Sequence, residues 1–386
     1  MKDKTLAIIV IMLTMVLALM IIANIYPFKK ESTPYKENAI PIADFSYLPK
    51  LVMFRDERIN FIDNSSDRDG EIVEWRWDFD NDGIIDSTEQ NPSYRYTKAG
   101  TYIVNLTVVD DDGAVSYCEK EIEVYNLGVL VIAHGFPGRW SRSVISCVSK
   151  VSLPVPVEVG FLEYVPWKSI RNAFEKLKEQ DVDRIIAIPL FVCGNSTHTP
   201  EIYEALEKLE TDLQIFCTSS LGDHSLLVDI FIDYGKMLCE DDPRNPFDRK
   251  VDPKDATLIF YGHGDPGDYG RNWISLAESI KEEIEKRSVF KEVKYCFMHG
   301  KGLRKAVKEA KGHPLVVPWF VARSVFSELP IRIVLRGYLI TGRCEYNSKY
   351  LVDHPNIPRW IEMQFYNYKN VIMWSNYHVM EGKVLT

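Results

Sequence analysis

The sequence lacks several features that would assign it to a familiar class. Its seven cysteines include no Cys-x-x-Cys pair, which excludes zinc ribbons and thioredoxin-type redox motifs. Basic residues are not in excess, because 46 Lys and Arg face 55 Asp and Glu, so no strong positive field attracts nucleic-acid phosphates. With 46% hydrophobic and 26% charged residues, the chain is neither disordered nor fibrous. Its 386 residues predict two or three domains.

Charge is also absent from the N-terminal segment. No charged residue occurs from Thr5 to Phe28, and this run is long enough to cross a bilayer. No Ala-x-Ala cleavage site follows it, which favours an uncleaved anchor over a signal peptide. We therefore predict a cytoplasmic stub and transmembrane anchor at residues 1–28 and a polar linker at 29–37. The expected location is the cell membrane, with the bulk of the chain on the extracytoplasmic side.

Residues 38–126 have the pattern of a small β domain. Apolar residues alternate with smaller or polar ones, which predicts strands, as at Tyr102, Val104, Leu106 and Val108. Three segments stand out: WDFDNDG (77–83), NPSYRY (91–96) and GTYIVNLTVVDDDG (100–113). They resemble the PKD (polycystic-kidney-disease-type) domain. The resemblance implies an immunoglobulin-like β-sandwich, usually extracellular, that contacts surface proteins or glycans.

One loop of this domain has the spacing of a calcium-binding loop. Around Gly83, the sequence fits D-x-D-x-D-G-x5-E with Asp78, Asp80, Asp82, Asp86 and Glu89. Carboxylates at alternate positions of a tight loop converge on a hard cation, and glycine permits the sharp turn. The flanking segments have the pattern of strands and not of EF-hand helices. A structural calcium site and a simple acidic turn therefore both remain open.

The rest of the chain repeats itself at an offset of about 130 residues. Four pairs of segments correspond: VLVIAHGFPGRW (129–140) with TLIFYGHGDPGDYG (257–270), VEVGFLE (157–163) with VKYCFMH (293–299), IAIPLFV (186–192) with LVVPWFV (315–321), and LGDHSLL (221–227) with LVDHPNI (351–357). Strand and helix patterns alternate in each copy, which predicts parallel sheets with helices on both faces. We expect two similar α/β halves, at residues 127–245 and 246–386.

Ionisable side chains recur where these strands end, which is the edge at which parallel sheets bind ligands. They are His134, Glu163 and His198 in the first half, and His263, His299 and the Arg323–Glu328 loop in the second. Imidazole with carboxylate suits a divalent cation such as cobalt, nickel, iron or zinc. Together with the run DVDRIIAIPLFVCGNSTHTPEI (181–202), this order of motifs resembles the class II, ATP-independent tetrapyrrole chelatases. Sirohydrochlorin cobaltochelatases and their nickel-inserting archaeal relatives are the most similar members.

The resemblance implies two halves around a cleft, with metal ligands at His134 and His198. It implies a catalytic set of His134, Glu163 and His198, with His263 and His299 as second-half metal candidates. The substrates would be Co²⁺ or Ni²⁺ and a sirohydrochlorin-type tetrapyrrole. Guanidinium groups bind carboxylates bidentately, so the candidate substrate clamps are Arg139, Arg142, Arg271 and Arg323. Four tryptophans are candidates for the lining of an apolar cleft: Trp140, Trp167, Trp273 and Trp319.

Two departures from the family pattern are visible. Phe136 stands where the family usually has serine, and Ser327 takes the position of His198 in the second half. Three functions therefore remain open. The first is a membrane-anchored metal chelatase, a lyase. The second is an extracytoplasmic protein that binds metal, haem or a corrinoid without turnover, and the third is an adhesion protein with an inactive chelatase-like domain.

Overall fold

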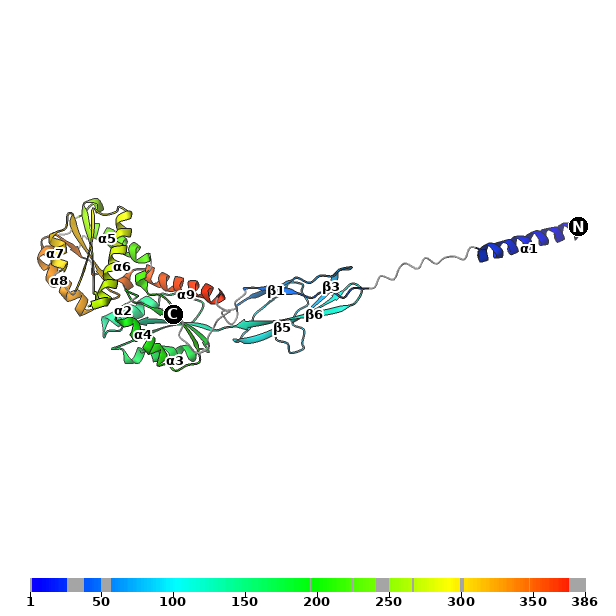
Figure 1. Cartoon of the computed structure of the whole chain (residues 1–386), viewed down its shortest axis with the longest axis horizontal. Helices are drawn as coiled ribbons and strands as arrows, with labels where there is room; N and C mark the ends of the chain where they lie inside the picture. Colours follow the sequence, from blue (N-terminus) through cyan, green and yellow to red (C-terminus); the bar gives the residue numbers. More distant parts are fainter. Residues whose placement is uncertain are drawn as a thin grey trace.

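The computed structural model describes residues 2–25, 38–49, 57–194, 196–223, 225–240, 250–265, 267–298, 302–346 and 348–374. In chain order, an N-terminal helix is followed by a β-sandwich and two α/β lobes (Figure 1). The predicted linker at 29–37 lies outside the described residues.

The N-terminal helix, α1 (Lys2–Ile25), exposes its large apolar side chains from Leu6 to Ile22. Across the part of the chain that the structure describes, no helix meets the combined requirement of length and apolarity for crossing a bilayer. The transmembrane anchor predicted at residues 1–28 is therefore not confirmed.

The β domain is a sandwich of two antiparallel sheets. One contains β1 (Phe45–Leu48), β2 (Ile59–Asp63) and β4 (Ser93–Tyr94), and the other contains β3 (Ile72–Asp78), β5 (Gly100–Asp110) and β6 (Val115–Val124). Alternate residues of β5 point inward, so Val104, Leu106 and Val108 are fully buried against Trp77. The predicted sandwich is confirmed.

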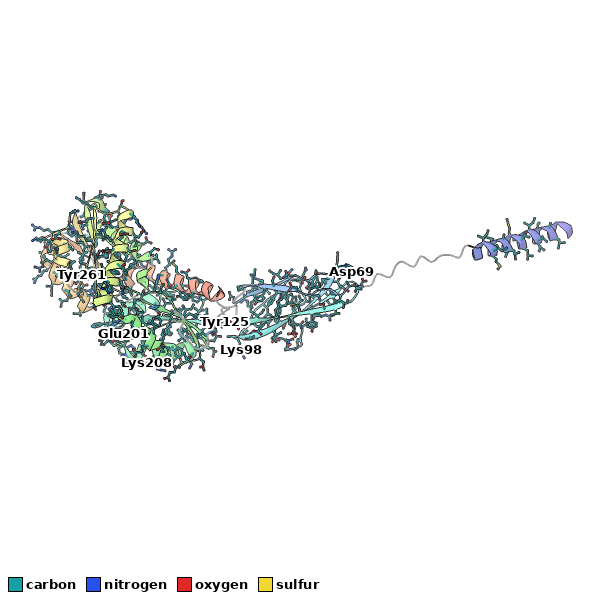
Figure 2. All side chains as sticks on the ribbon, in the orientation of Figure 1. Asp69, Lys98, Tyr125, Glu201, Lys208 and Tyr261 are labelled. Carbon is teal, nitrogen blue, oxygen red and sulfur yellow. The ribbon has the colours of Figure 1, made fainter. Side chains whose placement is uncertain are left out.

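The sandwich joins the first lobe through only two residues, Tyr125 and Asn126 (Figure 2). The Asn126 side-chain amide donates to the backbone carbonyls of Gln180 at 3.1 Å and Asp181 at 2.9 Å. The Arg184 guanidinium lies 3.4 Å from the centroid of the Tyr125 ring. These contacts attach the sandwich directly to the first lobe.

Both lobes contain a four-stranded parallel sheet of the same strand arrangement. The first has the order β10-β9-β7-β8, formed by β7 (Leu127–Ala133), β8 (Val157–Phe161), β9 (Arg184–Pro189) and β10 (Gln214–Cys217). The second has the equivalent order β12-β11-β13-β14, formed by β11 (Ala256–Gly262), β12 (Glu292–Phe297), β13 (His313–Trp319) and β14 (Glu345–Tyr346). The central strands β7 and β11 are buried along their whole length, as expected for strands covered on both faces.

Helices cover these sheets. In the first lobe they are α2 (Arg139–Val148), α3 (Ile170–Lys178) and α4 (His198–Glu207). In the second they are α6 (Gly267–Lys286), α7 (Gly302–Lys308) and α8 (Val325–Ile340). The predicted α/β architecture with parallel sheets and helices is confirmed.

The two lobes exchange their final helices. Helix α5 (Leu226–Cys239) follows the first sheet but packs on the second, where Phe231 stacks on Phe260 with ring centroids 5.0 Å apart. Helix α9 (Asn356–Trp374) ends the second half but returns to the first, where the Tyr368 hydroxyl donates to the Cys217 carbonyl at 3.0 Å. Neither lobe is closed without a helix from the other.

Candidate metal and macrocycle site

A cavity of about 600 Å³ is lined by residues of both lobes. Most of its walls come from the segments after β7, β9, β11 and β13, at the carboxyl ends of the central strands of both sheets. This is the edge at which open parallel sheets bind ligands. The lining includes three histidines, one from the first loop of each lobe and one from α4: His134, His263 and His198.

His134 follows β7 directly, and a tight turn fixes its position. Gly135 has φ 97°, and a Cβ atom there would lie 2.1 Å from the Glu163 carbonyl oxygen, so only glycine fits. The Glu163 N–H donates to the His134 carbonyl at 2.9 Å, which joins this loop to the one after β8. His134 Nδ1 lies 2.8 Å from the Gly135 carbonyl oxygen, which can only accept. Nδ1 therefore carries the proton, and Nε2 keeps a lone pair that is able to bind a metal ion.

His198 is the first residue of α4, which begins nine residues after the end of β9. Its Nδ1 lies 2.8 Å from the carboxylate of Glu201, one helical turn further on. This contact also leaves Nε2 as the ligand nitrogen, and a carboxylate behind an imidazole is a common way to orient a metal ligand. The His134 and His198 rings meet edge to face, with centroids 4.5 Å apart.

Glu163 stands beside this pair. Its Oε2 atom lies 3.8 Å from His134 Nε2, and its side chain is about half exposed. The next residue, Tyr164, lines the cavity with a left-handed φ of 59°, a strained conformation for a non-glycine residue. The Tyr164 hydroxyl donates to the Glu163 carboxylate, and this hydrogen bond together with the carboxylate charge raises the pKa of Tyr164. Glu163 thus links His134 to the cavity wall.

The second lobe repeats the first turn at His263. Gly264 also has a positive φ, 68°, and His263 Nδ1 lies 2.6 Å from the Gly264 carbonyl oxygen. Asp265 follows, with only 6% of its side chain exposed, and its Oδ1 lies 3.8 Å from His263 Nδ1. The duplicated motif therefore brings a third imidazole to the cavity, with a carboxylate beside it.

Asp265 also crosses between the lobes. Its Oδ2 atom accepts hydrogen bonds from the Trp273 indole at 3.0 Å and from the backbone N–H of Thr197 at 3.3 Å. Thr197 immediately precedes His198, so the second lobe holds the segment that carries a first-lobe histidine. Sequence reasoning missed both Asp265 and Glu201, although the spacings His-Gly-Asp and His-x-x-Glu were visible signals.

The three histidines do not form one compact ligand set. Among the described residues, the cavity provides no group of three ligand atoms that all lie within 4.8 Å of one another. His263 is therefore not placed to bind the same ion as His134 and His198. His299, the other second-half candidate, lies outside the described residues.

The predicted substrate clamps are not in the cavity wall. Arg139, Arg142 and Arg271 are exposed, and none of them is among the described lining residues. Arg323 binds the Glu328 carboxylate at 3.2 Å and does not line the cavity either. Of the four candidate tryptophans, Trp140, Trp273 and Trp319 line the cavity, whereas Trp167 is 68% exposed and does not.

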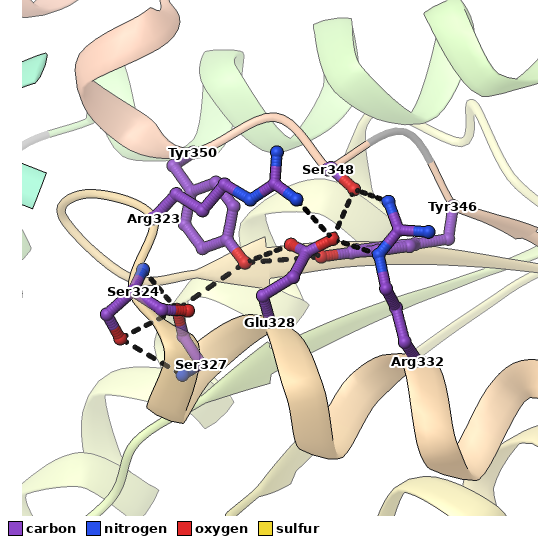
Figure 3. A network of polar contacts seen from close by, with 8 residues as sticks. All are labelled: Arg323, Ser324, Ser327, Glu328, Arg332, Tyr346, Ser348 and Tyr350. Carbon is purple, nitrogen blue, oxygen red and sulfur yellow. Dashed lines mark hydrogen bonds and ion pairs between the residues drawn. The ribbon is translucent and has the colours of Figure 1, made fainter. Parts of the chain in front are cut away.

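A polar network occupies the second-half position equivalent to His198 (Figure 3). Ser324 and Ser327 form a capping box at the start of α8, and both line the cavity. Behind them, the nearly buried Glu328 accepts hydrogen bonds from the hydroxyls of Tyr346 and Tyr350, both at 2.7 Å, and of Ser348 at 2.8 Å. Arg332 and Arg323 also bind this carboxylate.

This network changes the acidity of Glu328. Burial acts to raise its pKa, but the hydrogen bonds from Tyr350, Arg332, Tyr346 and Ser348 outweigh burial and lower the pKa from 4.5 to about 2. Glu328 is therefore a permanently charged structural group at neutral pH. The second half has a polar framework where the first has His198 at the start of α4.

The acidic loop of the sandwich is only partly assembled as predicted. Asp78, Asp80 and Asp86 bring carboxylate oxygens within 4.8 Å of one another. Asp82 instead accepts from the backbone N–H of Ile84, and Glu89 is not part of the group. Burial first, and then the charges of Asp82 and Asp86, raise the pKa of Asp80. Calcium binding stays a prediction.

This fold and cavity define a two-lobed α/β unit of the chelatase type behind a β-sandwich. Residues 128–234 match the family model CbiX, of class II chelatases, and residues 38–125 match the PKD domain model. The resemblances drawn from the sequence motifs are therefore confirmed.

Individual relatives match parts of the chain. The solved structure titled "SirB from Bacillus subtilis with Fe3+" covers 63% of this chain and 95% of its own, at 19% identity and a TM-score of 0.50, which supports a shared fold. The pre-pro-metalloprotease PrtV of Vibrio cholerae is 38% identical over 101 residues, 26% of this chain. Collagenase ColA of Clostridium perfringens is 43% identical over 83 residues, 20% of this chain. The chain spans 10% of the length of PrtV and 7% of that of ColA.

Proposed function

We propose that the protein is an ATP-independent chelatase that inserts a divalent metal into a free-base tetrapyrrole. One observation carries the proposal. Two imidazoles, His134 and His198, meet in a large cavity, and each has its Nδ1 hydrogen bonded, which leaves Nε2 to bind a ligand. The cavity, about 600 Å³, is within the range of roughly 300–1,000 Å³ that small-molecule sites have.

The chain's own groups suit the steps of this reaction. Metal insertion replaces two pyrrole protons by one divalent ion, so the site must hold the ion and accept protons. His134 and His198 would bind the incoming metal through Nε2, and Glu163 beside His134 would accept a proton. Contacts of the macrocycle with the cavity walls would sustain the ring distortion that insertion requires.

The finer assignment follows the family resemblance. Cobalt or nickel and a sirohydrochlorin-type macrocycle are the substrates that it implies, and they are the first to assay. The full chain is mixed with sirohydrochlorin and Co²⁺ or Ni²⁺, and insertion is followed by absorbance against a control without protein. We expect insertion above background that His134→Ala and His198→Ala abolish.

A matched control separates chemistry from folding. His313 stands at the start of β13, the end of the strand opposite the cavity, with its Nε2 atom 3.4 Å from the Glu345 carboxylate. His313→Gln should therefore insert metal like the parent. Circular dichroism of each variant checks the fold. No insertion by the parent into any free-base tetrapyrrole, with any divalent metal, would disprove the chelatase proposal.

A second candidate function is capture without turnover. Phe136 favours it, because a phenyl ring lines the cavity where the family pattern has a serine hydroxyl. A capture protein would bind metal, haem or a corrinoid tightly without any insertion. Under this alternative, His198→Ala would weaken metal binding in a protein that has no turnover to lose.

We propose a cell-membrane location with the bulk of the chain extracytoplasmic. The uncharged run from Thr5 to Phe28 and the usual extracellular setting of PKD domains support this location. Membrane fractionation of cells that express the full chain, followed by protease treatment of intact cells, tests it. Recovery in the soluble fraction, or protection of the sandwich from protease, would contradict it.

A further inference from the structure

The walls of the cavity are largely aromatic and aliphatic. Four aromatic side chains line it from the first lobe, namely Phe136, Trp140, Tyr164 and Phe191. Three more line it from the second lobe, namely Trp273, Trp319 and Phe320. Aromatic faces of this kind stack well on a flat, conjugated ring.

Positive charge is scarce on the same walls. No lysine or arginine is found among the described residues that line the cavity. The same described walls include one acidic side chain, Asp265, whose carboxylate repels other carboxylates. The exposed Arg139 adjoins the lining residue Trp140, so it lies next to the cavity in sequence and not in its wall.

This distribution of charge bears on the substrate. A macrocycle with carboxylates around its whole rim would press several of them against apolar walls without a partner, which is strongly unfavourable. A macrocycle with a mostly apolar rim can bury that rim and keep a few carboxylates at the mouth, in contact with water. We propose that the cavity prefers a tetrapyrrole with few carboxylates, all on one edge, over an octacarboxylate such as sirohydrochlorin. That the ligand is a tetrapyrrole rests on the proposed function.

The test uses three free-base porphyrins that differ in the number of carboxylates on the rim: mesoporphyrin, coproporphyrin and uroporphyrin, which are di-, tetra- and octacarboxylates. Each is titrated into the full chain without metal, and quenching of tryptophan fluorescence gives the Kd. We expect the dicarboxylate to bind tightest and the octacarboxylate weakest, by about tenfold or more, since unpaired buried charges are costly. Tightest binding by uroporphyrin or sirohydrochlorin would overturn the proposal.

Two tryptophan variants locate the binding. Trp140→Ala removes a wall residue and should weaken mesoporphyrin binding, whereas Trp167→Ala removes an exposed ring outside the cavity and should not. Equal Kd values for the two variants would also overturn the proposal, because binding would then lie elsewhere.

The proposed function and this preference can fail separately. His134→Ala should keep the order of porphyrin affinities while losing insertion. If the parent shows the expected order but inserts no metal, the chelatase proposal fails and the preference stands. If it inserts metal into sirohydrochlorin and binds octacarboxylates tightest, the reverse holds.

Discussion

Replacing Glu328 should reveal how strongly one buried carboxylate stabilises the second lobe. Its side chain is 9% exposed and accepts hydrogen bonds from two tyrosines, one serine and Arg332, with Arg323 also paired to it (Figure 3). These donors lower its pKa from 4.5 to about 2 even though burial opposes them. Since each tenfold change in proton affinity corresponds to about 1.4 kcal/mol, the charged form contributes about 3 kcal/mol at neutral pH.

The sign follows from the direction of the pKa shift. A carboxyl group with a lowered pKa in the folded state stabilises the fold fully above its unfolded pKa of 4.5. That contribution is lost as the pH falls from 4.5 toward 2. Glu328→Gln keeps the shape but not the charge. The free energy of unfolding of the parent should therefore exceed that of the variant by about 3 kcal/mol at pH 7. This difference should shrink as the pH falls through the acid range.

Denaturant unfolding of the full chain, parent and variant side by side from pH 7 to pH 2, measures this difference. Subtracting the two curves removes the titration of all other carboxylates. Glu204→Gln, which breaks an exposed ion pair with Lys208, is a control that should change stability little at any pH. A difference below about 1 kcal/mol at pH 7, or one that does not vary with pH, would refute the assignment of the low pKa to Glu328.

Three further predictions follow from the contacts of the site and the sandwich. Glu201→Gln should weaken Co²⁺ binding by about tenfold or more in calorimetry, because it loosens His198, and Glu204→Gln should not. Asp265→Ala should lower the free energy of unfolding by about 2–4 kcal/mol, whereas Asp265→Asn, which can still accept both hydrogen bonds, should cost less. If the sandwich binds Ca²⁺, Asp80→Asn should weaken that binding and Glu89→Gln should not, because Asp80 belongs to the group of three carboxylates and Glu89 does not.

The fold was predictable wherever one residue pattern admits one solution. Alternation in β5 indicates a strand with one buried face, and the short apolar run of β7, which ends in His-Gly, indicates a strand covered on both faces. The repeat then required two equivalent sheets. His134 was predictable as a strand-end residue for the same reason, because a histidine and a glycine directly after a buried strand must lie at the ligand-binding edge.

The exchange of helices was not predictable from the same patterns. Helix α5 follows its own sheet closely in sequence, and its apolar residues would suit either lobe. Phe231 packs on Phe260 and Trp319 only because the second lobe lies within reach, which is a property of the packed molecule. The predicted boundary between residues 245 and 246 therefore divides the sequence into its two repeats. It does not divide the structure into two independent lobes, because each lobe packs a helix from the other half.

The substrate clamps show a different limit. Arg323 has the right position in sequence for a clamp, but a carboxylate five residues later takes up its guanidinium. The sequence shows which side chains are able to bind an anion. It does not show whether another side chain of the same protein is already paired with them. Asp265 was missed for the complementary reason, since its two donors, Thr197 and Trp273, come from different lobes.

The asymmetry of the two halves has a physical reason under the proposed function. Both lobes line one cavity, so a second imidazole pair would place two cations and their repulsion in a space of about 600 Å³. The second half instead presents Ser327, whose hydroxyl is bound within the α8 capping box. It also supplies Asp265, which holds the segment before His198. One half then binds the metal while the other shapes the cavity, so the cavity should take up one Co²⁺ per chain. A second bound Co²⁺ that is lost in His263→Ala would show that His263 anchors a second ion.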